Sequence, residues 1–372
     1  MRSTAHRRLA GVLAGLAWAA YAAAGAEPAP PAIAFLEKEQ AQAAIIDDAL
    51  EKYFDQLQPM EMAAKTGAPV AGATLQEQRA QCRQRYQAGV AVFTEAERTA
   101  IRWHVAKLIP VLLKDYPLIG RMPWSFLKVS DQIEGGLPHT RGRHIILPAS
   151  LCQQIVLTQQ EPAAAMAYLG ILDLLAHEQM HVFQRIYPAF CDSLYTGLWG
   201  FQKAEAITAC PWLLEHHLAN PDAVACPWIL PVKKGTATAY LWPLVVFSEG
   251  NDVKQMPDDF RMLAISLRKT TQGFAVEVAA DGKPAAQDLL LVPEVRALFP
   301  LTSSSYHPNE ASADLFGKLV VFDAFMAKAS MPPANKQAID KHLGPLRKWF
   351  QENCRDPTHS AHGRSKTAPL HD

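Results

Sequence analysis

Residues 161–187 read EPAAAMAYLGILDLLAHEQMHVFQRIY, and this stretch decides the fold that we expect. It is rich in strong helix formers, Pro162 suits the first turn of a helix, and Pro188 ends the run. Leucine and isoleucine residues between positions 169 and 175 make the helix apolar on nearly every side, so it should be central and buried. Polar groups in such a helix need partners, because leaving them unpaired costs several kcal/mol.

The second half of this helix contains His177-Glu178-Gln179-Met180-His181. Two histidines four residues apart leave a helix on the same face, one turn apart. They can therefore offer two nitrogen ligands to one metal ion, with Glu178 beside them as a candidate general base. The alternative is a pair of core histidines that ordinary hydrogen bonds satisfy, and the motif alone does not exclude it.

A downstream segment, NEASAD at residues 309–314, carries carboxylates that can complete such a site. A catalytic zinc needs three protein ligands and an open water position, and Glu310 is the natural third ligand. Glu310 and Asp314 share one helix face, so one carboxylate can bind the metal while the other accepts the ring N–H of a ligand histidine. Hydroxyls at residues 303–305 offer caps for this helix. Alone, the segment would be interpreted as a solvated acidic helix start that the helix dipole favours.

The two motifs together, HEQMH and NEASAD, resemble those of the gluzincin zinc metallopeptidases, the thermolysin-like enzymes. The resemblance implies three zinc ligands, namely His177, His181 and Glu310. It also implies that Glu178 is the catalytic base and that Asp314 supports a ligand histidine. Asn309 matches the asparagine that precedes the ligand glutamate in that family. The resemblance covers only these two motifs and the helices that carry them.

The spacing of the motifs departs from the thermolysin-like pattern. More than a hundred residues separate His181 from Glu310, far more than in those enzymes. Loop closure costs rise only slowly with length, so this distance is compatible with a common site and indicates a family-specific insertion. Residues 139–148, 220–223 and 307–316 are similar to uncharacterised bacterial proteins that are predicted to be peptidases.

The expected chemistry follows from a metal-bound water. Zinc lowers the pKa of that water and polarises a scissile carbonyl, and Glu178 can accept the water proton and deliver it to the leaving amine. A hydrogen-bond donor should stabilise the oxyanion, and Tyr306 and His307 are the nearest candidates in the sequence. His307 could instead pack or cap the following helix. Asp173, one turn before His177, could support a ligand or solvate the pocket.

The expected fold class is α+β, with a zincin-like core, a mixed or antiparallel sheet and a buried active-site helix. In zincin folds, which the chain resembles, an edge strand binds an extended peptide by strand addition, and residues 138–147 occupy the corresponding position here. The alternative is a buried strand with a structural role only. His139 and Arg141 in this stretch could line the cleft.

The expected organisation is a signal peptide at 1–26, a helical region at 27–128, the metallopeptidase core at 129–354 with a β-rich insertion at about 232–300, and a disordered tail at 355–372. Helices are expected over 45–57, 75–91, 95–115, which Pro110 should kink or split, and 311–327. Strands are expected at 143–147, 236–247, 263–267 and 274–279.

The amino terminus indicates export. Arginines precede an apolar run at 9–24, and Ala24-Gly25-Ala26 matches the small-residue rule for cleavage after Ala26. We therefore expect a periplasmic or secreted protein. The run is too short for a membrane anchor, and no later segment is apolar enough to cross a bilayer, so no stable membrane insertion is expected.

The six cysteines suggest disulfides, because their number is even and the protein is expected to be exported. Cys210 and Cys226 are the favoured pair, since each lies in a copy of Ala-Cys-Pro-Trp. A metal site that combines these cysteines with His216 and His217 is an alternative, which the absence of CxxC spacing disfavours.

The charge balance and the presence of Glu178 reduce the number of function classes that fit the sequence. The sequence has 36 Lys and Arg against 36 Asp and Glu and no basic block, which argues against nucleic acid as a partner. Three interpretations remain: a zinc peptidase acting on peptides or proteins, a hydrolase of another amide such as a cell-wall peptide, and a non-catalytic metal-binding protein. Glu178 favours the first two, because a structural zinc site prefers four closed ligands and has no use for a free base.

Overall fold

The computed structural model describes residues 30–161, 164–249, 254–326 and 333–354. The expected signal peptide at 1–26, the tail at 355–372 and Pro162 lie outside these residues. No helix within the described ranges is long and apolar enough to span a bilayer.

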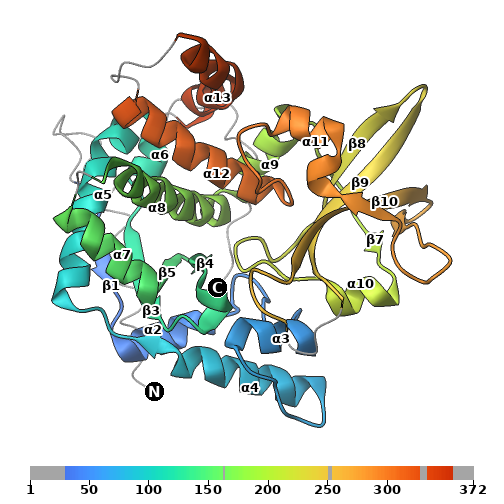
Figure 1. Cartoon of the computed structure of the whole chain (residues 1–372), viewed down its shortest axis with the longest axis horizontal. Helices are drawn as coiled ribbons and strands as arrows, with labels where there is room; N and C mark the ends of the chain where they lie inside the picture. Colours follow the sequence, from blue (N-terminus) through green and yellow to red (C-terminus); the bar gives the residue numbers. More distant parts are fainter. Residues whose placement is uncertain (1–29, 162–163, 250–253, 327–332, 355–372) are drawn as a thin grey trace, which may run out of the picture.

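A five-stranded mixed sheet organises the first half of the chain (Figure 1). Its strands are β1 (Ile33–Phe35), β2 (Val90–Ala91), β3 (Trp124–Val129), β4 (His139–Arg141) and β5 (His144–Pro148). β3 pairs in parallel with β1 and β5 and antiparallel with β2, and β4 pairs antiparallel with β5 at one edge.

Both faces of this sheet are buried, because successive residues of a strand point to opposite sides. Phe126 and Ile145 belong to the apolar core on one face, whereas Leu127 and Ile146 belong to the core on the other. The first core is built mainly by α5 (Glu95–Asp115), α8 (Ala165–Ile186) and α12 (Pro308–Val321), with a smaller part from α7 (Ala149–Gln160). The second is built by α2 (Lys38–Ile45), α3 (Pro59–Thr66) and α4 (Leu75–Ala88). The sheet thus lies between two helical layers.

A second, seven-stranded sheet is formed by the chain between the two metal motifs and lies at the right of Figure 1. Its strands are β6 (Gln202–Lys203), β7 (Ile207–Thr208), β8 (Trp228–Lys234), β9 (Ala237–Phe247), β10 (Phe260–Thr270), β11 (Gly273–Val276) and β12 (Ala286–Asp288). Strands β8 to β11 form an antiparallel meander, which has an apolar cluster of its own.

The remaining helices are α6 (Pro117–Gly120), α9 (Pro188–Gly197), α10 (Pro211–His216), α11 (Pro293–Leu298) and α13 (Pro333–Asn353), with short turns η1 (Ile133–Gly136), η2 (Leu289–Leu291) and η3 (Phe322–Met326). α12 packs along α8 (Figure 1). This contact joins the two helices that carry the metal motifs.

The structure confirms the α+β class and corrects several of the expected elements. The expected helix over 45–57 is absent, because the side chains of Asp47 and Asp48 accept backbone N–H groups of Ala49 and Phe54 and so stabilise turns. Pro110 does not split this segment into two helices, since α5 continues through it with Pro110 on the exposed side.

Two expected boundaries also differ from the observed elements. The expected domain boundary at residue 129 falls within the five-stranded sheet, because β1, β2 and β3 precede this boundary in the chain and β4 and β5 follow it. The strands of the second sheet run from Gln202 to Asp288 rather than over 232–300.

Candidate metal centre

Three side chains from two helices converge where α8 contacts α12. His177 and His181 come from α8, and Glu310 comes from the first turn of α12. The Nε2 atoms of the two histidines are 3.0 Å apart, and Oε1 of Glu310 is 3.5 Å from Nε2 of His181. Oε2 of Glu310 is 3.8 Å from Nε2 of His177. Within the described residues, this is the group of His, Cys, Asp or Glu side chains that could hold a metal ion.

The spacing of these atoms fits a tetrahedral metal. Bonds of about 2.1 Å at tetrahedral angles separate two ligand atoms by about 3.4 Å. The measured separations lie on both sides of that value, between 3.0 Å and 3.8 Å. Two imidazole nitrogens and one carboxylate leave a fourth position of a tetrahedral metal open.

Gln184 orients one ligand and ties the two helices together. Its Oε1 accepts the Nδ1–H of His181 at 2.7 Å, which leaves the Nε2 lone pair of that ring directed at the centre. Its Nε2 donates to the backbone oxygen of Asn309 at 2.9 Å and to Oγ of Ser312 at 2.7 Å. Sequence reasoning missed Gln184, although its position three residues after His181 places it on the same helix face.

Asn220 holds the third ligand from a different segment. Its Nδ2 donates to Oε1 of Glu310 at 2.6 Å, and its Oδ1 accepts the backbone N–H of Asp222. Sequence reasoning assigned no role to Asn220, although residues 220–223 belong to the stretches similar to predicted bacterial peptidases. Only the folded chain brings this loop to Glu310.

The electrostatics of the cluster suit metal ligation. Burial, together with the neighbouring His181, lowers the pKa of His177, so this ring stays neutral with a free lone pair. Although burial opposes ionisation of Glu310, the two histidines and the Asn220 amide hold its pKa well below its ordinary value. Burial likewise opposes protonation of His181, but Glu310 and Asp222 raise its pKa to about 10. A metal must therefore displace a proton from His181.

Glu178 lies next to the ligands and lines the same cavity. The side chain is buried, and burial followed by the nearby carboxylate of Asp222 raises its pKa well above the ordinary value. Its Oε2 makes no hydrogen bond within the described part of the chain. A buried oxygen without a partner is costly, so its retention beside three metal-type ligands fits a group that serves an additional molecule such as water.

Tyr306 and His307, the candidates for oxyanion stabilisation, have different hydrogen-bond partners. Tyr306 lines the cavity and donates a hydrogen bond to Glu310, and burial followed by that carboxylate raises the pKa of its phenol. His307 instead caps α12, because its Nδ1 accepts the backbone N–H of Asn309 at 3.0 Å. Its Nε2–H donates to the backbone oxygen of Ala225 at 3.3 Å, and burial lowers its pKa to about 4. His307 also lines the cavity, but both of its ring nitrogens bond to backbone groups, so no ring N–H is left to donate to an oxyanion.

The expected supporting carboxylates also lie differently. Asp314 pairs with Lys318 at 2.5 Å. We expect Asp314 to accept the ring N–H of a ligand histidine, but for His181 the acceptor is Gln184. Asp173 faces Gly317 at the crossing of α8 and α12 and does not line the cavity. Asn309, which matches the family motif, contributes its backbone to the Gln184 network.

The expected peptide-binding strand is closed to strand addition. Residues 138–147 form a hairpin of β4 and β5, with β4 at the sheet edge. The outward backbone N–H of Thr140 donates to Asp222 at 2.6 Å, and its carbonyl accepts from Arg185 at 3.1 Å. Both groups that a substrate strand would need at Thr140 are thus occupied, and all three residues of β4 are buried. The alternative of a buried structural strand is the correct one.

The metal ligands open into a cavity of about 640 Å³. One wall is apolar and includes Leu218, Val245, Phe260 and Met262. His139 borders the cavity as expected, whereas Arg141 points into the protein and pairs with Asp48 at 2.6 Å. The cavity therefore combines an apolar wall with the polar side chains of the candidate metal centre.

The amino-terminal helices form part of this cavity. Lys65 of α3 lines it and is fully buried, with Nζ 2.8 Å from Oε2 of Glu134 and 2.9 Å from the backbone oxygen of Ala219. Glu61, one turn earlier, accepts the backbone N–H of Ala219 at 2.9 Å. Lys65 and Glu61 therefore bind the backbone oxygen and the backbone N–H of Ala219, which directly precedes Asn220. The region before the expected core thus positions the loop that supports Glu310.

The cysteine hypotheses are not supported by the structure. All six cysteines, which lie in the described residues, are free thiols, so the expected Cys210–Cys226 disulfide is not formed. Nδ1 of His216 donates to the backbone oxygen of Trp212, and the ring stacks on that indole. No metal-ligand group that includes these cysteines occurs among the described residues.

Comparisons of the chain with protein-family models, with curated proteins and with solved structures find no match. The description of the site therefore depends on its own residues and their geometry.

Proposed function

We propose that this protein is an exported zinc-dependent peptidase of the gluzincin type. The observation that carries the proposal is the convergence of His177, His181 and Glu310 with the spacing that zinc requires. The unpartnered carboxylate of Glu178 beside them supports hydrolysis rather than a structural metal site. Export is inferred from residues 1–26, which the structure does not describe.

The residues of the chain have distinct roles in the proposed reaction. A bound zinc ion supplies Lewis acidity and a water of lowered pKa. Glu178 accepts the proton of the attacking water at its carboxylate and returns it to the nitrogen of the leaving amine. Gln184 and Asn220 orient the ligands, and the phenol of Tyr306, which donates to Glu310, supplies the hydrogen bond to the developing oxyanion.

The substrate is proposed to be a peptide, or a peptide-like amide such as one from a cell wall, bound within the cavity. Because Asp222 and Arg185 occupy the edge of β4, recognition depends on the cavity walls rather than on main-chain pairing at that strand. The apolar wall favours an apolar side chain next to the scissile bond.

Metal content tests the ligand set. The purified mature protein, dialysed against a weak chelator, should retain about one zinc per chain, and Glu310→Ala should lose it. Glu215→Ala, an exposed glutamate on α10, is the matched control and should retain the metal. Metal retained in Glu310→Ala would mean that another residue completes the site.

Cleavage of a peptide library tests the reaction itself. Glu178→Gln keeps the shape of the side chain and removes its basicity, so we expect zinc binding to persist while the rate falls by at least about a hundredfold. Zinc bound with no cleavage by the wild type of any peptide or cell-wall fragment would favour a non-catalytic metal-binding protein.

A further inference from the structure

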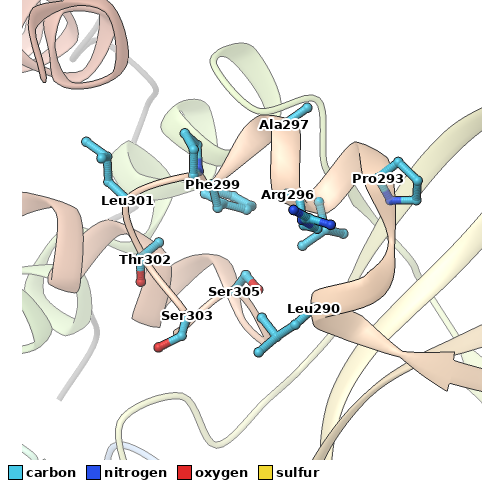
Figure 2. Close-up of a pocket in the computed structure, with 11 residues that line it drawn as sticks. Leu290, Pro293, Arg296, Ala297, Phe299, Leu301, Thr302, Ser303 and Ser305 are labelled. Atoms are coloured by element: carbon cyan, nitrogen blue, oxygen red, sulfur yellow. The ribbon is translucent and has the colours of Figure 1, made fainter. Parts of the chain in front are cut away.

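A second hollow lies on the outside of the molecule, between α11 and the segment at 299–305 that leads into α12. Its volume is about 700 Å³. Figure 2 shows Arg296 of α11 directed toward the hollow, with Thr302, Ser303 and Ser305 on the opposite side. None of these residues belongs to the metal centre, so an inference about this hollow does not depend on the proposed function.

The charge of the hollow is unbalanced. Arg296 is exposed and has no ion pair within the described part of the chain. The residues that line the hollow in that part of the chain include no aspartate or glutamate. A guanidinium group presents a planar set of donors that match a carboxylate or a phosphate, so this surface favours an anion.

The hydroxyl groups opposite Arg296 are not consumed by the fold. Their expected use as helix caps is wrong, because His307 caps α12 instead. Oγ of Thr302 accepts the backbone N–H of Ser304 at 2.9 Å, which leaves its own O–H free to donate. Ser305 is only 2% exposed, and its Oγ has no hydrogen-bond partner in the described residues. A buried hydroxyl without a partner at the edge of a hollow indicates a place for a polar ligand atom.

The floor of the hollow is apolar and well supported. Phe299 is buried, and its ring packs edge-on against Trp199 with centroids 5.1 Å apart. Leu290, Pro293 and Leu301 add apolar surface around it (Figure 2). A ligand of this site should therefore combine an apolar body with its negative charge.

We propose that this hollow binds a small organic anion with an apolar body. Arg296 pairs with the carboxylate or phosphate of the ligand, and the hydroxyls of Thr302 and Ser305 donate to its remaining oxygens. The apolar body lies on Phe299 and Pro293.

The experiment measures binding of three probes to the purified protein, without added metal, by calorimetry. The probes are 4-phenylbutyrate, phenyl phosphate and the uncharged 4-phenylbutan-1-ol. At least one anion should bind saturably in the millimolar range or tighter, and the alcohol at least about tenfold more weakly. Preference between the two anions distinguishes a carboxylate ligand from a phosphate ester.

Variants locate the binding. Arg296→Gln replaces an exposed charged side chain. It should weaken the binding of the anion by about tenfold or more without changing the melting temperature of the protein. Arg268→Gln, an exposed arginine on β10, should leave the affinity unchanged. Three results would overturn the proposal: binding of the alcohol as tight as that of the anions, anion binding that survives in Arg296→Gln, or no saturable binding of either anion.

Discussion

Gln184 is the residue on which the geometry of the metal centre depends most directly. It accepts the N–H of His181 and donates to α12 at Asn309 and Ser312, so one amide joins both motif helices. Hydrogen bonds to a ligand histidine fix its tautomer and raise its basicity. The side chain should therefore affect metal affinity although it cannot touch the metal.

Replacement of Gln184 tests this role. Gln184→Ala should weaken zinc binding by about 10- to 100-fold, because His181 loses the acceptor that fixes its orientation. Competition with a chromophoric chelator measures the affinity. Gln153→Ala, an exposed glutamine on α7, is the control and should bind zinc like the wild type. Unchanged affinity in Gln184→Ala would show that packing alone orients His181.

Asp173 should contribute a pH dependence to stability. Burial, partly offset by Lys318, raises its pKa from 3.8 to about 6, and its buried Oδ1 has no hydrogen-bond partner among the residues that the structure describes. The folded protein then holds the proton more tightly than the unfolded chain. The contribution to stability is full below the unfolded pKa and is lost as the pH rises through the folded pKa.

Substitution by asparagine makes this contribution measurable. Between about pH 4 and pH 7, the stability of the metal-free wild type relative to Asp173→Asn should fall by up to about 3 kcal/mol. Urea unfolding at several pH values measures the difference. Asp258→Asn, at an exposed position, should show no such trend. A relative stability that rises with pH would contradict the predicted sign.

At the scale of elements, the contact between α8 and α12 depends on Gly317. A Cβ added there would lie 2.6 Å from the backbone oxygen of Asp173, closer than real Cβ atoms approach. The helices therefore need a glycine at their crossing. A glycine inside a helix normally costs stability relative to alanine, so the packing requirement and the helix propensity oppose each other at this position.

We expect packing to decide the sign. Gly317→Ala should destabilise the protein by about 1–3 kcal/mol and weaken zinc binding, because α12 carries Glu310. Gly170→Ala, in α8 with open space around the added Cβ, should stabilise it by about 0.5–1 kcal/mol. Urea unfolding of both variants checks the comparison. Equal effects of the two substitutions would mean that α12 can shift without cost.

The covered edge of β4 is a second feature that depends on contacts between elements. Its sequence predicts an edge strand and the sheet order agrees, but Asp222 and Arg185 cover the backbone of Thr140. Arg185 is held in turn by Glu51 at 2.7 Å. Covering an edge in this way prevents pairing with other chains. In the proposed function, substrate recognition therefore depends on the cavity.

At the scale of the whole molecule, a metal ion would link parts of the chain that are far apart in sequence. His181 and Glu310 belong to different helices. Asn220 donates a hydrogen bond to Glu310, and the residue before it, Ala219, is held by the side chains of Glu61 and Lys65 from α3. A ligand that binds only the folded state stabilises it by mass action. Zinc at about a thousand times its dissociation constant should raise the free energy of unfolding by about 4 kcal/mol.

Chemical unfolding with and without zinc measures this linkage. The stabilisation should be absent in Glu310→Ala and present in Glu215→Ala. A similar gain in Glu310→Ala would place the stabilising metal at another site.

The sequence by itself determined the α+β class, the metal helix and the three side chains that meet at the centre. These features are local: a helix follows from propensity and apolar pattern, and two histidines four residues apart share a face wherever that helix lies. The convergence of Glu310 with them could be predicted because the donor set was chemically incomplete without it.

Only the tertiary structure decided which groups support and surround the centre. Gln184, Asn220 and Lys65 act through partners 125, 90 and 154 residues away, and no local pattern encodes such contacts. The same holds for His307, whose ring nitrogens bond to the backbone of Asn309 and Ala225, and for β4, whose edge is closed by distant side chains. A hydrogen-bond donor or acceptor is satisfied by whichever group the packed chain places within reach, and that placement is a property of the fold as a whole.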